Sequence, residues 1–126
     1  RTDATTTIHL AIIAAATLAV SRGFDIETFD VTAAFLSGME IKRKLYTKAP
    51  PEGLSAAEGW KAIRPYQLLQ VLKGAYGLTE APRLWYLRAR QILVETIGLV
   101  ELKCARPVFT FRQNEELIAL LTLHVA

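Results

Sequence analysis

The stretch FDIETFDVTAAFLSG, residues 24–38, decides the expected fold. Residues 24–31 alternate between two faces, which predicts a β-strand. Residues 32–38 are mostly small and end in Gly38, which predicts a turn directly after that strand. The rest of the chain is expected to surround this strand and turn.

Asp30 is the residue of most interest in this stretch, because it lies between Phe29 and Val31 in a segment that otherwise has the pattern of a buried strand. A buried carboxylate is costly unless it is paired, hydrogen-bonded or bound to a cation. Asp30 is therefore either a metal ligand or a cap for the turn at Thr32 or Ala33. The residues alone leave both interpretations open.

The first half of the chain predicts one more helix and short strands. Residues 8–21 are apolar on nearly every face, which is typical of a buried helix, and Gly23 follows as a stop. Polar residues 1–7 could cap this helix. Residues 45–47 predict a short strand. A Pro- and Gly-rich loop ends before residue 60. Residues 60–73 are expected to be ordered, and their core candidates are Leu68, Leu69, Val71 and Leu72.

The second half predicts an amphipathic helix and a hairpin. Pro82 suits the first turn of a helix over residues 83–97, and Gly98 suits its end. Residues 107–112 and 116–125 predict two strands joined by a turn at 113–115. The expected fold class is therefore α+β, with a mostly antiparallel sheet covered by helices on one side. A hydrophobic content of 52% also predicts a substantial core within one domain, or a piece of one.

Composition excludes several classes of protein. The longest apolar run, residues 8–20, is shorter than the ~20 residues of a membrane span, so no membrane partner is expected. The lone Cys104 excludes an internal disulfide and a zinc cluster and favours an intracellular setting. His9 and His124 are expected to be core or edge histidines. A net charge of +3 is compatible with a polyanionic partner without requiring one.

The densest basic patch is Lys42, Arg43, Lys44 and Lys48. A solvated hairpin surface and a phosphate-binding surface would both have this composition, and the solvated surface is the simpler interpretation.

Four segments together carry a resemblance to a known family. They are FDVTAAFLSG (29–38), LYTKAPPEG (45–53), LKGAYGLTEAPRLWY (72–86) and ARPVFTFRQNEELIALLTLHV (105–125). In this order and rough spacing they resemble the Ty1/copia-type retrotransposon reverse transcriptases. The resemblance implies a partial reverse transcriptase domain over residues 1–126, made of fingers and a polymerase palm-like sheet.

The resemblance implies roles for individual residues. Asp30 would be the first metal-binding catalytic aspartate, and Val31 would offer its backbone carbonyl to a second metal. Phe35 would be the aromatic residue that packs under the sugar of the incoming nucleotide and excludes a 2′-hydroxyl. Glu80 lies in the segment that forms the floor of the nucleotide and template site. The residues expected to contact nucleic acid are Lys42, Arg43, Lys44, Lys48, Arg83 and Arg88.

The implied activity is RNA-directed DNA synthesis, a nucleotidyl transfer that uses two Mg²⁺ ions. The implied partners are an RNA/DNA primer–template, dNTPs and the remainder of a polyprotein, in a cytoplasmic particle or the nucleus. The chain departs from the family in two ways. Glu80 replaces an uncharged glutamine, and Ala126 stands where the first aspartate of a second catalytic motif is expected.

One carboxylate cannot hold two Mg²⁺ ions, so the domain is expected to be truncated at that motif and the fragment alone to be inactive. The alternatives to a polymerase domain are a non-catalytic nucleic-acid-binding remnant and a decayed structural fragment.

Overall fold

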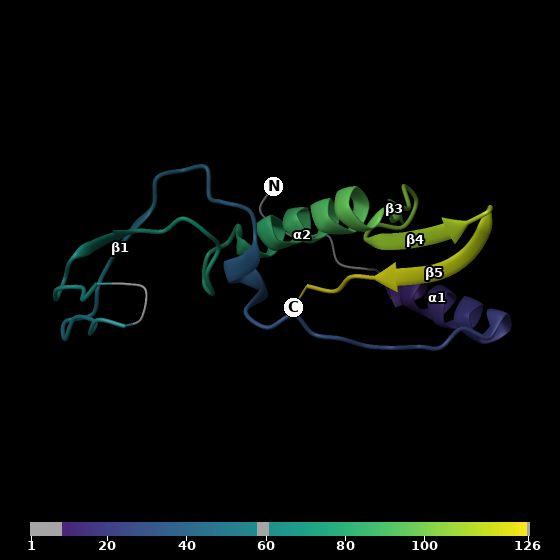
Figure 1. Cartoon of the computed structure of the whole chain (residues 1–126), viewed down its shortest axis with the longest axis horizontal. Helices are drawn as coiled ribbons and strands as arrows, with labels where there is room; N and C mark the ends of the chain where they lie inside the picture. Colours follow the sequence, from purple (N-terminus) through teal and green to yellow (C-terminus); the bar gives the residue numbers. More distant parts are fainter. Residues whose placement is uncertain (1–8, 58–60, 126) are drawn as a thin grey trace.

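The computed structural model describes residues 9–57 and 61–125 and confirms a small α+β fold with antiparallel sheets (Figure 1). The expected N-cap at residues 1–7 lies outside the described residues. The elements, in chain order, are α1 (His9–Arg22), the 3₁₀-helix η1 (Ala34–Ser37), β1 (Tyr46–Lys48), β2 (Leu68–Gln70), α2 (Ala81–Gln91), its π-helical continuation η2 (Ile92–Ile97), β3 (Val100–Glu101), β4 (Val108–Gln113) and β5 (Glu116–Thr122).

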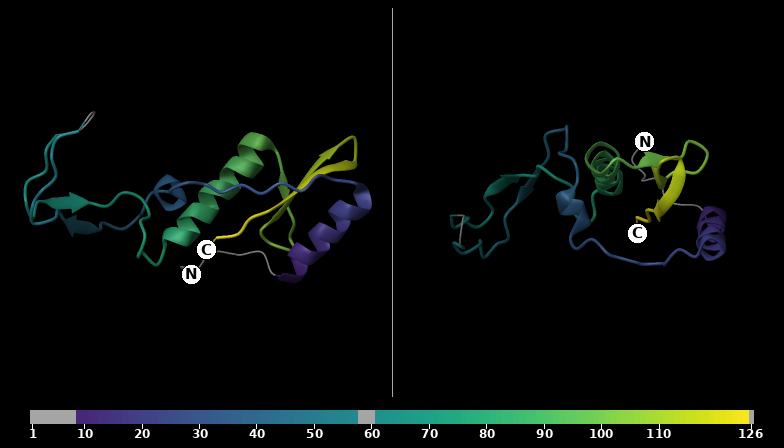
Figure 2. Two further views of the ribbon diagram at one scale, coloured as in Figure 1. Left: turned by 90° about the horizontal axis from the view of Figure 1, so that it is seen from below. Right: turned by 45° about the vertical axis from the view of Figure 1, so that its right-hand side comes forward.

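The strands form two separate sheets. β1 pairs with β2 in a two-stranded sheet, and the second sheet has the order β3-β4-β5. Figures 1 and 2 show an elongated molecule, in which β1 lies at one end, α2 in the middle, and β4, β5 and α1 at the other end. The β1–β2 sheet and the loops around it, residues 40–73, are called the β1–β2 lobe below.

The helix and hairpin of the second half form as predicted. Pro82 lies in the first turn of α2, and Gly98 ends η2 with a φ of 90°, a left-handed conformation that glycine adopts without strain. β4 and β5 pair in antiparallel register with Phe109 opposite Leu121. Their two-residue turn has positive φ at both Asn114 (51°) and Glu115 (65°), as a tight hairpin requires.

The core is small and lies where α2 meets the three-stranded sheet. Phe109 of β4 is fully buried, and the buried Tyr86 of α2 donates its hydroxyl to Glu101 of β3. The other buried apolar residues of α2 and of the chain that follows it are Ala81, Ala89, Leu99, Val108 and Leu117, of which Ala81 packs against Gly74 at the start of the helix. The prediction of a substantial core from composition is therefore wrong for the described residues, because many large apolar side chains remain exposed.

The prediction of a buried helix over residues 8–21 is wrong about burial, although the helix itself forms. No residue of α1 is buried, and Leu10 and Val20 are more than 70% exposed. Local propensity explains the helix, since Ala- and Leu-rich segments are good helix formers. Burial needs a second element against the apolar surface, and no described helix or strand packs extensively on α1.

The predicted strand over residues 24–31 does not form. These residues lack strand pairing, and Phe29 is 72% exposed. Alternation predicts side-chain directions, but a strand also needs a neighbour for its backbone hydrogen bonds, and neither described sheet includes this segment. The segment runs from the end of α1 to η1 (Figure 1), and it delivers Asp30 to an exposed position.

The β1–β2 lobe contains the predicted short strand, shifted by one residue to Tyr46–Lys48. Its partner β2 includes Leu68, which was expected in the core but is 60% exposed, and Leu72 is also exposed. A two-stranded sheet has no second layer here to cover these side chains. Leu69 and Val71 are half-buried.

Candidate functional site

A cavity of about 790 Å³ brings the segment that contains Asp30 next to the end of β5. One wall is residues 27–35 and another is residues 122–125, and Tyr76 and Trp85 complete the lining. Figure 1 shows the segment after β5 running back toward η1. The fold therefore brings three distant parts of the chain to one concave site, which is the usual setting of a ligand site.

Local backbone structure positions Phe35 at this cavity. Ala33 adopts a left-handed conformation (φ 52°) immediately before η1, which turns the chain after the extended segment. On the other side of η1, the backbone N–H of Met39 donates to the carbonyl of Leu84 in α2 over 3.1 Å. A Cβ atom on Gly38 would lie 3.1 Å from the backbone nitrogen of Trp85, so glycine permits this close contact.

Phe35 also contacts Tyr76, from the turn before α2. Their ring centroids are 5.2 Å apart and the rings are tilted by 58°. This is within the range of favourable aromatic pairs. Two residues before Tyr76, a Cβ on Gly74 would lie 3.2 Å from the carbonyl oxygen of Phe35, so the two backbones are also in close contact.

Asp30 is exposed at the cavity, not buried in a strand as the sequence indicated. The two ion pairs between described residues are Arg43–Glu80 and Arg90–Glu101, so neither uses Asp30. Within the described part of the chain, no group of three or more His, Cys, Asp or Glu side chains could hold a metal ion. The described residues therefore offer carboxylate oxygen, the ligand type that Mg²⁺ prefers, but do not complete a two-metal site.

Glu80 lies outside the cavity lining and is paired. The Nε atom of Arg43 donates to Oε1 of Glu80 over 2.7 Å, and the hydroxyl of Thr79 donates to Oε2 over 3.1 Å. The hydrogen bond from Arg43 lowers the pKa of Glu80 to about 2. The extra negative charge at this position is thus balanced within the protein.

The residues expected to bind nucleic acid fall on two parts of the chain. Lys42, Lys44 and Lys48 are exposed on the β1–β2 lobe. Arg83 is half-buried and Arg88 is exposed, and both lie on α2, where Arg88 donates to Oε1 of Gln91 over 2.9 Å. The lysines thus have the exposure that phosphate contact needs, and solvation alone would produce the same exposure.

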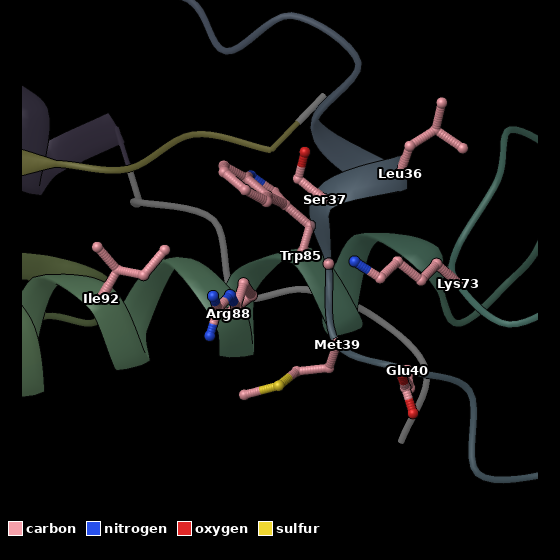
Figure 3. A pocket seen from close by; sticks show the side chains of 9 residues that line it. Leu36, Ser37, Met39, Glu40, Lys73, Trp85, Arg88 and Ile92 are labelled. Carbon is pink, nitrogen blue, oxygen red and sulfur yellow. The ribbon is translucent and has the colours of Figure 1, made fainter. Parts of the chain in front are cut away.

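A smaller pocket of about 470 Å³ lies beside η1 and α2, and Trp85 lines both pockets. Its charged residues are Glu40, Lys73 and Arg88. Figure 3 shows Lys73 and Arg88 on opposite sides of the segment that carries Met39 in that view. The cavity of about 790 Å³ is larger and gathers three distant parts of the chain, so it is the better candidate for a functional site.

Sequence reasoning missed Tyr76 and Trp85 as parts of the site, whereas the resemblance had implied a second catalytic motif directly after residues 116–125. Tyr76 stands between Ala75 and Gly77 in a turn, and a large aromatic residue in such a turn is a signal that could have identified it. His124 was expected in the core or at an edge. It is exposed and lines the cavity instead.

Comparison with known proteins finds similarity to Pol polyproteins of plant transposons. The chain is 31% identical over 104 residues, 82% of its length, to the "Retrovirus-related Pol polyprotein from transposon RE1" of Arabidopsis thaliana. It is equally similar to the corresponding polyprotein from transposon RE2 of the same plant. It is also 34% identical over 71 residues, 56% of its length, to the polyprotein from transposon TNT 1-94 of Nicotiana tabacum.

The chain spans only 5–7% of the length of these relatives. No family model matches it, and no solved structure matches it significantly.

In residues 9–57 and 61–125, no helix has both the length and the apolar character to cross a membrane. The relatives are parts of larger polyproteins, which is consistent with the expected association with other polyprotein segments. The similarity supports an origin of this chain in a retrotransposon Pol polyprotein.

Proposed function

We propose that this chain is the fingers and palm part of a copia-type reverse transcriptase, an RNA-directed DNA polymerase. The observation that carries the proposal is the cavity that brings Asp30 and Phe35 together with residues 122–125. The resemblance implies a metal ligand at Asp30, a sugar-facing aromatic residue at Phe35, and a strand that leads into the second catalytic motif at residues 122–125. Asp30 and Phe35 are five residues apart, but residues 122–125 are almost ninety residues further along the chain, so their meeting with Asp30 and Phe35 in one cavity is not a consequence of chain proximity.

In this proposal the cavity receives the triphosphate and sugar of a dNTP. Asp30 supplies one carboxylate oxygen toward Mg²⁺, and the backbone of Val31 forms part of the same wall of the cavity. Phe35 packs against the sugar. Magnesium bound with the triphosphate would neutralise the developing negative charge of the leaving group. Because the described residues do not complete a two-metal site, residues 1–126 alone are expected to bind a nucleotide without extending a primer.

The ion pair of Glu80 with Arg43 reduces the electrostatic repulsion that Glu80 would otherwise exert on a bound nucleotide. A free carboxylate near a triphosphate would repel it, whereas Glu80 is engaged by Arg43 and Thr79. The partners in this proposal are dNTPs, an RNA/DNA primer–template and the remainder of the polyprotein, in a cytoplasmic particle or the nucleus.

Calorimetric titration of residues 1–126 with dATP in MgCl₂ tests this function. Asp30→Asn keeps the shape of the side chain and removes its charge, and it is expected to weaken dATP binding roughly tenfold. Asp25→Asn is the matched control, since Asp25 is exposed on the same segment but does not line the cavity. Equal affinities for the two variants, or no binding by the unsubstituted chain, would refute the proposal.

A second candidate is a nucleic-acid-binding remnant without catalysis. The exposed Lys42, Lys44 and Lys48 on the β1–β2 lobe favour it. Binding through phosphates falls steeply as salt rises, because counterions are released from the nucleic acid. An RNA–DNA duplex that shows no binding at ~50 mM salt, where such contacts are strong, rules out this candidate.

A further inference from the structure

The turn before α2 places a large, exposed aromatic ring at the cavity. Tyr76 is 79% exposed, yet it lines the cavity and contacts Phe35 at a centroid distance of 5.2 Å. A side chain so exposed contributes little to the core. Its contact with Phe35 is therefore the feature of Tyr76 that needs a functional account.

The backbones of the two aromatic residues are held together independently of their rings. Gly74 approaches the carbonyl oxygen of Phe35 so closely that a Cβ there would lie 3.2 Å away, and it would also lie 3.0 Å from Cβ of Ala81. On the other side of η1, Gly38 packs on the backbone of α2. These contacts fix the backbone on both sides of Phe35 and bring the turn that carries Tyr76 against it, so the main remaining freedom of Phe35 is rotation of its side chain.

We propose that Tyr76 is a positioning residue that holds the Phe35 ring and thereby sets discrimination between deoxyribose and ribose nucleotides. The proposal rests on the proposed function of the cavity. Phe35 excludes a 2′-hydroxyl only if its ring cannot rotate away. A ring that rotates away leaves room for the extra oxygen. The Tyr76 ring, whose centroid lies 5.2 Å from that of Phe35 at a tilt of 58°, would oppose that rotation by favouring the observed position of the Phe35 ring.

The expected size of the effect follows from the free energy of an aromatic contact. Such a pair stabilises one arrangement by an amount that corresponds to roughly a two- to tenfold change in an equilibrium constant. Tyr76→Leu is therefore expected to lower the ratio of dATP to ATP affinity by roughly two- to tenfold, chiefly by tightening ATP binding. Tyr76→Phe keeps the ring and is expected to retain the ratio of the unsubstituted chain.

The experiment is calorimetric titration of residues 1–126 and its variants with dATP and with ATP in MgCl₂. Tyr66→Leu is the matched control, because Tyr66 is also exposed but does not line the cavity. In a Phe35→Leu background, Tyr76→Leu is expected to change nothing further, since the effect of Tyr76 acts through Phe35. Both Tyr76 variants are expected to fold, because the side chain is 79% exposed.

The outcomes separate this inference from the function on which it rests. If the unsubstituted chain prefers dATP and Tyr76→Leu keeps that preference unchanged, Tyr76 has no positioning role while the nucleotide site stands. If Tyr76→Leu lowers affinity for both nucleotides equally, its role is general binding and the inference is again wrong. If the unsubstituted chain binds neither nucleotide, the proposed function fails, and this inference fails with it.

Discussion

Arg43 and Glu80 form an ion pair of 2.7 Å that joins the β1–β2 lobe to the start of α2. Arg43 precedes β1, and Glu80 is the residue before the first turn of α2. The described chain contains no other ion pair between these two parts of the molecule. The pair therefore balances the charge of Glu80 and adds a contact between the lobe and the helix.

Titration of Glu80 provides a direct check on this pair. The hydrogen bond from Arg43 lowers its pKa to about 2, so the carboxylate stays ionised in acid where an unpaired glutamate becomes protonated. A lowered pKa contributes stability above pH 4.5, and this contribution is lost as the pH falls through about 2. Carbon-13 NMR of the side-chain carboxyl is expected to show this low midpoint, and Arg43→Ala should raise it toward 4.5. A Glu80 midpoint unchanged by Arg43→Ala would show that the two residues are not paired.

Tyr86 is expected to ionise late and to contribute to stability. Its hydroxyl donates to Oε1 of Glu101, whose other oxygen accepts from Arg90 over 2.5 Å. Burial, together with the Glu101 carboxylate, raises the pKa of Tyr86 to about 12. A raised pKa contributes stability below pH 10, which is lost as the pH rises through about 12.

Tyr86→Phe is predicted to lower the free energy of unfolding by about 1–3 kcal/mol, because it removes one hydrogen bond to a buried charge. Urea denaturation measures this loss, and absorbance at alkaline pH should lose its latest-ionising component. Tyr66→Phe, at an exposed tyrosine, should change the free energy of unfolding by less than about 0.5 kcal/mol. Equal losses in the two variants would show that the contact with Glu101 does not stabilise the fold.

Phe109 is predicted to be the most sensitive apolar position. It is fully buried in β4, so Phe109→Ala should cost about 3–5 kcal/mol through lost burial and an unfilled cavity. Phe29→Ala is the matched substitution at a side chain that is 72% exposed, and it should change stability by less than about 0.5 kcal/mol. Thermal unfolding followed by circular dichroism distinguishes the two variants, and similar losses would contradict the position of the core.

The hairpin turn offers a stabilising substitution. Glu115 has a φ of 65°, which costs a non-glycine residue about 1–2 kcal/mol. Glu115→Gly creates the Asn-Gly pair that such turns favour and should raise the free energy of unfolding by up to about 1 kcal/mol. Glu116→Gly, one residue later in β5, should destabilise instead. A loss of stability in both variants would mean that the turn does not have this conformation.

Local signals predicted the parts of the fold that depend on neighbours in sequence. Pro82 and Gly98 marked both ends of the long helix, and a polar turn between apolar runs marked the hairpin. Each of these features is determined by backbone preferences within a few residues.

The wrong predictions concern partners that sequence patterns do not identify. The apolar surface of α1 and the alternation of residues 24–31 predicted burial and pairing, and neither has a partner element in the described structure. For the same reason, the pattern was wrong about the burial of Asp30, which is exposed at the cavity, while its role as a metal ligand stays a prediction. The turn pattern could have marked Tyr76 as a candidate, but its contact with Phe35 depends on how the turn before α2 meets η1.

The central claim is that the cavity beside Asp30 binds a nucleotide together with a divalent cation. Amide NMR spectra of residues 1–126 with dATP and Mn²⁺, whose unpaired electrons broaden nearby resonances, test it most directly. The account predicts broadening centred on residues 29–35 and 122–125, strongly reduced in Asp30→Asn and retained in Asp25→Asn. Broadening centred elsewhere, or a pattern unchanged by Asp30→Asn, would contradict it.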